Sequence, residues 1–121
     1  MKIWIIIGSI LIGLGIIFGA FASHTLKSKL SLTDLNIFET GVRYQIYHSL
    51  GLILLGLLGF NYPKPLINIS AKLFIIGILL FSFSLYTLVL TDMRWIGAIT
   101  PLGGLCFILG WFLLAFKIYK Y

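Results

Sequence analysis

The chain of 121 residues is 60% hydrophobic and only 10% charged, and its mean hydropathy is +1.11. Soluble domains are roughly half apolar and a quarter charged, so this composition excludes a water-soluble globule and indicates a single integral membrane domain over residues 1–121. The net charge of +6 comes from cations spread singly between apolar blocks, a pattern that excludes nucleic acid as a partner and favours anionic lipid headgroups of the bilayer.

Four stretches contain no Asp, Glu, Lys or Arg, and each approaches the ~20 residues that a helix needs to cross the hydrocarbon of a membrane. These predicted spans are residues 3–23, 44–62, 73–91 and 95–116. Continuous apolar blocks of this length exclude a closed barrel, whose strands alternate over ~10 residues. The predicted fold is therefore an all-α membrane protein, a bundle of four transmembrane helices with a short amphipathic segment between helices 1 and 2.

The first stretch has two features that bear on its role. Lys2 and the small-x-small sequence Ala20–Ala22 would also suit a cleaved signal peptide, but the apolar stretch is longer than the usual ~7 to 15 residues, which favours a retained span. Gly15 and Gly19 form a GxxxG motif that lets another helix approach closely. The partner helix could belong to the same chain or to a second copy.

The connection over residues 24–43 is the only substantial polar segment. Its second half is predicted to be a helix that continues into the second span, capped by Ser31 or Thr33. Glu39 and Arg43 are four residues apart and should form a helical ion pair. The inward-facing residues of this amphipathic helix are predicted to be Leu35, Phe38 and Val42.

The remaining connections set the predicted topology. Pro63 and Pro65 mark residues 61–72 as a connection, and residues 92–94 form a tight hairpin. With four spans, both termini lie on one side together with the second connection. That side holds five cations against four on the other, so both termini are expected in the cytoplasm.

The fourth stretch contains a break in its helical pattern. Pro101 cannot donate a backbone hydrogen bond to the carbonyl of Gly97, so a kink or a local opening of the helix is expected near it. Such a kink could hold a cavity or fit a neighbouring helix. The small or helix-breaking residues expected to serve packing here are Gly97, Pro101, Gly103 and Gly104.

Polar residues gather at one predicted membrane face, and they are the candidate ligand or partner surface. The members of this polar face are His24, Glu39, Arg43, Tyr44, His48, Asp92 and Arg94. His48 lies within a predicted span, where an ionisable side chain merits a functional hypothesis. It could be a neutral histidine that locks helix 2 against helix 1, or a proton-linked or ligand-binding group.

Catalysis and metal binding have little support. Metal binding by His24 and His48, with Glu39 or Asp92 as a third ligand, stays an alternative, although no close-spaced ligand motif accompanies them. No nucleophile and base pair appears, and no cofactor, catalytic residue or metal is predicted.

Three segments of the chain resemble a known family. Residues 19–27 (GAFASHTLK), 38–48 (FETGVRYQIYH) and 97–104 (GAITPLGG) are similar to motifs of the DUF423 or UPF0382 family of small bacterial membrane proteins, which is related to a eukaryotic transmembrane protein often placed in mitochondria. The chain departs from the family pattern at Ala22, Ser23 and Phe83. The resemblance runs nearly end to end and implies the fold, a multi-pass location in the inner membrane of a bacterial cell and possible oligomers, but no activity.

Three functional hypotheses follow. The first is a non-enzymatic membrane protein whose polar face organises the bundle and binds lipid, a second copy or another membrane protein. The second is a small transporter or a proton or ion pathway that depends on His48. The third is a membrane enzyme or quinone-binding subunit that uses His24, Tyr44 and His48, although the chain has no haem, flavin or nucleotide motif.

Overall fold

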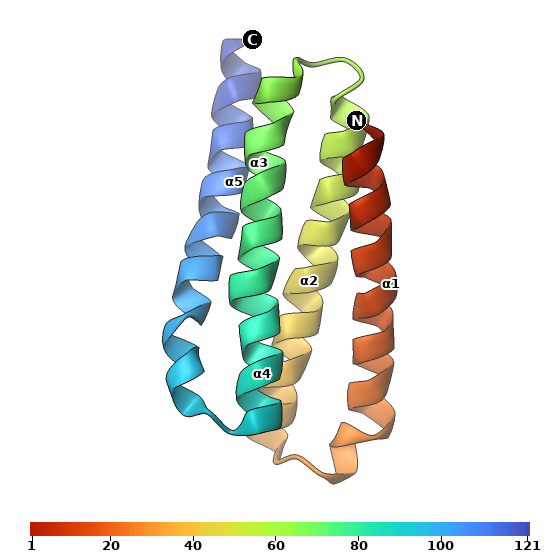
Figure 1. Ribbon diagram of the computed structural model, residues 1–121, viewed down its shortest axis with the longest axis vertical. Coiled ribbons are helices and arrows are strands. Elements are labelled where there is room, and N and C mark those ends of the chain that lie inside the picture. Colours follow the sequence, from red (N-terminus) through yellow and green to blue (C-terminus); the bar gives the residue numbers. More distant parts are fainter.

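The computed structural model describes residues 1–121, and all of its regular structure is helical (Figure 1). Three short elements, η1 to η3, adjoin the five α-helices. The elements in chain order are α1 (Lys2–His24), η1 (Leu26–Ser28), α2 (Leu32–Leu58), α3 (Lys64–Gly77), the π-helical η2 (Ile78–Phe83), α4 (Ser84–Thr91), η3 (Arg94–Ala98) and α5 (Thr100–Lys120).

Three helical segments are long and apolar enough to cross a membrane, namely 2–28, 64–91 and 94–120. The helix α2 has 27 residues, a comparable length, but its first half carries the polar residues of the first connection. The prediction of an all-helical fold with several spans is confirmed. The second predicted span, 44–62, lies in α2 as far as Leu58, where that helix ends.

The first connection folds largely as its sequence predicts. The Ser31 hydroxyl accepts a hydrogen bond from the Asp34 backbone N–H at 3.1 Å, so Ser31 is the N-cap of α2. Phe38 and Val42 are buried, Leu35 is half-buried, and the helix continues without a break into the apolar half of α2. The amphipathic segment is therefore the first part of α2.

Two predicted boundaries are wrong. The second connection is only residues 59–63, because α3 begins at Lys64 and has Pro65 in its first turn, where a missing N–H costs no hydrogen bond. In the fourth stretch, Arg94–Ala98 is a 3₁₀ turn and α5 begins at Thr100. Pro101 thus lies in the first turn of α5, and the α-helix is interrupted directly before it, inside the apolar segment 94–120.

The helices form two antiparallel pairs (Figure 1). One pair is α1 with α2, and the other is the continuous unit α3–η2–α4 with α5. Contacts of α2 with α3, η2 and α4 join the two pairs. Both termini and the connection between α2 and α3 lie at the same end of the molecule, while η1 and η3 lie at the opposite end (Figure 1).

Two buried clusters form the core. The larger lies toward the end that carries the termini and the smaller toward the other end. The larger cluster contains Trp4, Leu52, Leu55, Leu66, Ile67, Ala71, Phe74, Ile78, Phe107 and Leu114. The smaller cluster contains Ala22, Leu26, Phe38, Val42, Tyr86, Leu88, Val89 and Ile96.

Candidate functional site

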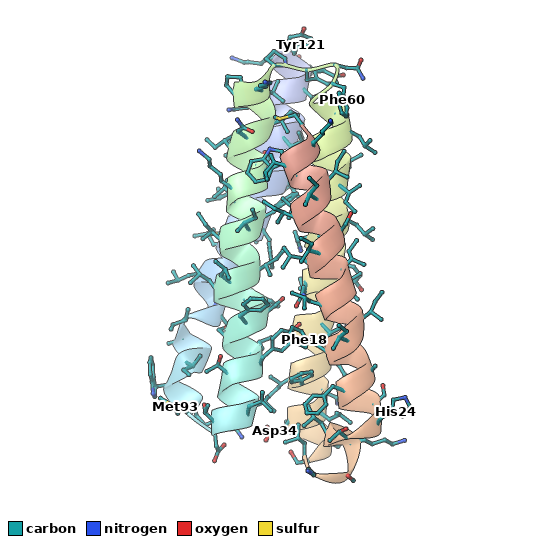
Figure 2. All side chains as sticks on the ribbon, turned by 45° about the vertical axis from the view of Figure 1, so that its right-hand side comes forward. Phe18, His24, Asp34, Phe60, Met93 and Tyr121 are labelled. Carbon is teal, nitrogen blue, oxygen red and sulfur yellow. The ribbon has the colours of Figure 1, made fainter.

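The seven residues of the predicted polar face do not gather in one place. His24 is exposed at the end of α1, and Figure 2 shows it directed away from the other helices. Arg43 is exposed and donates a hydrogen bond to Thr40 Oγ1 at 2.9 Å, while Glu39 is half-buried and forms no salt bridge. The predicted ion pair between Glu39 and Arg43 is therefore not formed.

Arg94 and Asp92 belong to an ion cluster with Asp34. Arg94 donates from Nη1 and Nη2 to the two carboxylate oxygens of Asp34 at 3.0 and 2.9 Å, and from Nε to Asp92 Oδ1 at 2.7 Å. The hydrogen bonds from Arg94 hold the pKa of Asp34 below its usual value, and the positive charge of Arg94 acts in the same direction. The cluster ties the connection between α4 and α5 to the start of α2. Asp34 was not among the predicted site residues.

His48 lies inside the molecule and connects α2 to α5. Its Nδ1 is 2.9 Å from the backbone carbonyl oxygen of Tyr44, and its Nε2 accepts a hydrogen bond from Trp111 Nε1 at 3.0 Å. A carbonyl only accepts and an indole N–H only donates, so this geometry requires a neutral imidazole with its proton on Nδ1. The partner helix is α5, whereas the structural hypothesis from the sequence placed it at helix 1.

Aromatic rings surround His48. Its ring stacks on Phe107 with centroids 3.5 Å apart and meets the edge of Phe74 at 5.2 Å. Tyr44, one turn away on α2, packs on Phe81 with centroids 4.7 Å apart. This arrangement leaves a hollow of about 360 Å³, which we call the aromatic hollow. Its lining residues are Tyr44, His48, Phe81, Gly104, Phe107, Ile108 and Trp111.

The buried side chain of Gln45 forms hydrogen bonds to two other helices. It is fully buried, its Nε2 donates to the Leu11 carbonyl of α1 at 2.8 Å, and its Oε1 accepts from the Tyr86 hydroxyl of α4 at 2.7 Å. One amide thus joins three helices. The sequence offered a signal, since Gln45 is an uncharged polar residue inside an apolar helix, but its partners could not be read from spacing.

The glycines of α1 pack against α2 of the same chain. A Cβ added at Gly15 would lie 3.0 Å from Ile46 Cγ1, and one at Gly19 would lie 3.4 Å from Val42 Cγ1. Gly8 is in closer contact, because a Cβ there would lie 2.6 Å from the Ser49 carbonyl oxygen. The small residues therefore form a seam within the monomer.

The glycines near the start of α5 differ from one another. A Cβ at Gly103 would lie 2.4 Å from the backbone nitrogen of Phe81, in the π-helical turn η2, and one at Gly97 would lie 3.3 Å from Leu88 Cδ1. A Cβ at Gly104 would meet only the Phe81 ring, at 3.8 Å. Gly103 thus permits the close approach of α5 to η2, whereas Gly104 leaves open space in the aromatic hollow.

The two histidines lie far apart. Gly8 of α1 faces Ser49, the residue after His48, and His24 is 16 residues further along α1, which corresponds to about 24 Å of helix. No three His, Cys, Asp or Glu side chains lie together in a way that would hold a metal ion. The alternative of a metal site built on both histidines is therefore not supported by the geometry.

Comparison with known proteins agrees with the resemblance seen in the motifs. The family model described as "Protein of unknown function (DUF423)" matches residues 18–104. A UPF0382 membrane protein of Staphylococcus haemolyticus is 41% identical over 121 residues, which cover 100% of this chain and 98% of the relative. The UPF0382 membrane protein YwdK of Bacillus subtilis is 39% identical over 122 residues, which cover 100% and 99%. No solved structure matches the chain.

The three apolar helical segments are typical of a multi-pass membrane protein. The relatives are bacterial and are named membrane proteins, which places the chain in the same class. Within that class, the chain belongs to the DUF423 family, whose curated relatives are called UPF0382 membrane proteins. The family prediction is thereby confirmed.

Proposed function

We propose that the chain crosses the membrane four times and serves as a non-enzymatic binding protein for one amphiphilic molecule of the lipid class, held in the aromatic hollow. The observation that carries the proposal is an apolar, aromatic hollow with the exposed ring of Tyr44 at its side, built into a face between membrane helices. The proposal has three parts: the fourth span, the ligand and the orientation.

The helix α2 is the fourth span because it hides its polar side chains. Gln45, His48 and Ser49 are buried and hydrogen-bonded inside the molecule. Other apolar residues of the same helix face outward, as a lipid-facing surface requires, while Leu52 and Leu55 stay in the core. The exposed apolar residues of α2 beyond this point are Leu50, Leu54 and Leu57.

The chemistry of the aromatic hollow defines its ligand. Phe81, Phe107 and Trp111 offer flat apolar surfaces, which bind chains or rings by burial and dispersion. Tyr44 is 38% exposed, and its hydroxyl can donate a hydrogen bond to an ester or carbonyl oxygen. Both ring nitrogens of His48 are already engaged, so His48 shapes the wall and does not bind the ligand head.

We also propose that both termini lie in the cytoplasm. Lys2, Lys64, Lys117 and Lys120 lie near the end that carries the termini, and the three acidic residues of the chain all lie toward the other end. Short segments rich in Lys favour the cytoplasmic side.

Native mass spectrometry of the purified protein in mild detergent tests the proposed ligand. Gly104→Leu should fill the aromatic hollow without a backbone clash, since an added Cβ meets only the Phe81 ring. Gly13→Leu is the matched control, because a Cβ at Gly13 has no atom within 4 Å. We expect a lipid-class adduct on the wild type and on Gly13→Leu. On Gly104→Leu the fraction of protein that carries the adduct should fall about tenfold, which corresponds to a loss of ~1.4 kcal/mol in binding free energy.

A wild type without any adduct, or an adduct that survives in Gly104→Leu, would contradict the proposal. The rival proton pathway through His48 requires the hydrogen bond from Trp111 to break, because a proton on Nε2 would replace its acceptor lone pair. Proteoliposomes with proton flux that is abolished in His48→Phe would favour that rival.

A further inference from the structure

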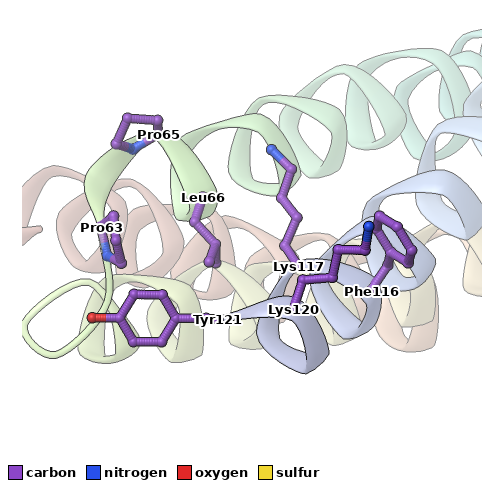
Figure 3. A pocket seen from close by; sticks show the side chains of 7 residues that line it. All are labelled: Pro63, Pro65, Leu66, Phe116, Lys117, Lys120 and Tyr121. Atoms are coloured by element: carbon purple, nitrogen blue, oxygen red, sulfur yellow. The ribbon is translucent and has the colours of Figure 1, made fainter.

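A second hollow lies at the end of the molecule that carries the termini (Figure 3). It has a volume of about 370 Å³ and lies between the start of α3 and the end of α5. Its lining residues are Pro63, Pro65, Leu66, Phe116, Lys117, Lys120 and Tyr121. None of them belongs to the aromatic hollow, so this second hollow, the lysine hollow, is a separate feature.

The lysine hollow combines two cations with an apolar wall. Figure 3 shows Lys117 and Lys120 on its rim, with Pro63 and Pro65 on the other side. The Lys120 ammonium lies 5.0 Å from the centre of the ring of Phe116, another lining residue, a cation–π contact at the rim. Both salt bridges of the chain involve Arg94, so neither Lys117 nor Lys120 forms one.

We infer that the lysine hollow binds the phosphodiester headgroup of an anionic phospholipid. The two ammonium groups supply positive charge for an anionic phosphodiester, and Leu66, Phe116 and the prolines offer the apolar surface that the glycerol and upper acyl chains of a lipid need. A free phosphate ion would use only the lysines and leave that apolar surface in contact with water.

The charge distribution of the whole chain supports this assignment. Lys2 and Lys64 lie at the same end, which has no acidic residue, and their field attracts anionic lipid toward the lysine hollow. Lys27 and Lys29 are exposed at the opposite end and line no hollow. They provide a control with the same change of net charge.

The test is native mass spectrometry of the full chain titrated with phosphatidylglycerol, with phosphatidylcholine or with inorganic phosphate. The double variant Lys117→Gln, Lys120→Gln is compared with the wild type and with the control Lys27→Gln, Lys29→Gln. Each lysine near an anionic surface contributes ~1 kcal/mol, so we expect phosphatidylglycerol retention to fall about thirtyfold in the first variant only. All four positions are at the surface, and circular dichroism should show unchanged helix content.

Three results would overturn the inference. Equal loss in both double variants would make the effect one of net charge. Equal retention of phosphatidylcholine and phosphatidylglycerol would show that the anionic headgroup is not recognised. Displacement of phosphatidylglycerol by inorganic phosphate at comparable concentration would assign the lysines to a free anion. The Gly104→Leu variant should leave this binding unchanged, so the lysine hollow and the aromatic hollow are tested independently.

Discussion

Gln45 shows how a single side chain can hold several membrane helices together. A buried amide without partners would cost several kcal/mol in an apolar environment, so Gln45 needs both its acceptor, the Leu11 carbonyl oxygen, and its donor, the Tyr86 hydroxyl. His48 is satisfied in the same way by Tyr44 and Trp111. The interior polar groups therefore determine which helices are neighbours, whereas apolar contact alone discriminates poorly within lipid.

Replacing Gln45 by Leu should destabilise the protein by about 1–2 kcal/mol, because hydrogen bonds between membrane helices contribute about 0.6 on average and at most about 1.7 kcal/mol. Thermal unfolding in detergent measures the effect. Tyr86→Phe and the double variant complete a cycle, and the two changes should be non-additive. Additive effects would show that the hydrogen bond between Gln45 and Tyr86 contributes no stability.

Asp34 gives a prediction for acid pH. Its pKa is lowered in the folded protein, first by the hydrogen bonds from Arg94, so the ion cluster stabilises the fold fully above the unfolded pKa of ~3.9. This contribution is lost as the pH falls through the lower folded pKa. The unfolding temperature of the wild type should therefore drop more steeply below about pH 4 than that of Asp34→Asn. Parallel pH profiles would contradict this role.

At the scale of the elements, glycine positions set how closely the helices approach. Gly8 brings α1 against the Ser49 backbone, and Gly103 brings α5 against the backbone of η2 at Phe81. At each position a methyl group would push one helix away from the other, because the atoms that it meets belong to a backbone and cannot rotate aside.

Gly8→Ala should therefore cost about 1–3 kcal/mol of stability, the usual range for overpacking. Gly13→Ala, on the same helix, meets no atom and should leave stability unchanged or raise it by up to ~1 kcal/mol through helix propensity. Chemical or thermal unfolding in one detergent compares the two variants. Equal stabilities would show that α1 does not pack on α2 as described.

A second pair of variants concerns α5. Gly103→Ala should destabilise by about 1–3 kcal/mol through its contact with Phe81, whereas Gly104→Ala should be tolerated. The same unfolding assay provides the measurement. Destabilisation by Gly104→Ala alone would reverse the assignment of the two glycines and remove the basis for using Gly104 to fill the aromatic hollow.

Elements were easier to predict than contacts. Apolar blocks located the helices because the absence of charge over ~20 residues is a strong signal. Helix rotation could not be predicted, since an apolar span has little periodicity, so the contacts of Gln45 with two other helices and of His48 with α5 stayed hidden. The start of α3 was predicted too late because Lys72 was assigned to the connection. Lys72 is instead exposed on the helix, where it can extend its ammonium toward the headgroups.

The candidate site was predicted in composition but not in arrangement. Tyr44 and His48 were recognised as neighbours on one helix, a relation that follows from the i, i+4 spacing alone. The link between Asp34 and Arg94 joins residues 60 positions apart, and such a contact depends on the packing of α2 against α4. His24 was grouped with His48 because both lie near one predicted interface. In the structure, the part of α1 that faces the neighbour of His48 is Gly8, which is 16 residues before His24.

For the whole molecule, the number of spans decides where the termini lie. If α2 crosses the membrane, reporter proteins fused at Met1 and at Tyr121 should occupy the same compartment; if α2 lies on the surface, three spans place them in opposite compartments. Paired fusions that are active only in the cytoplasm or only outside it give the measurement. A cytoplasmic result for both fusions would also support the proposed orientation.

The position of the aromatic hollow, midway along α2 and α5, has a consequence for how it fills. If the hollow binds a lipid-class molecule as proposed, that molecule would reach it by lateral diffusion from the surrounding lipid, so occupancy would follow its mole fraction in the bilayer and not its concentration in water. Bulk lipid is then the competitor at every encounter. A modest preference over ordinary acyl chains is enough for high occupancy when the ligand is abundant, and a scarce ligand needs a correspondingly larger preference.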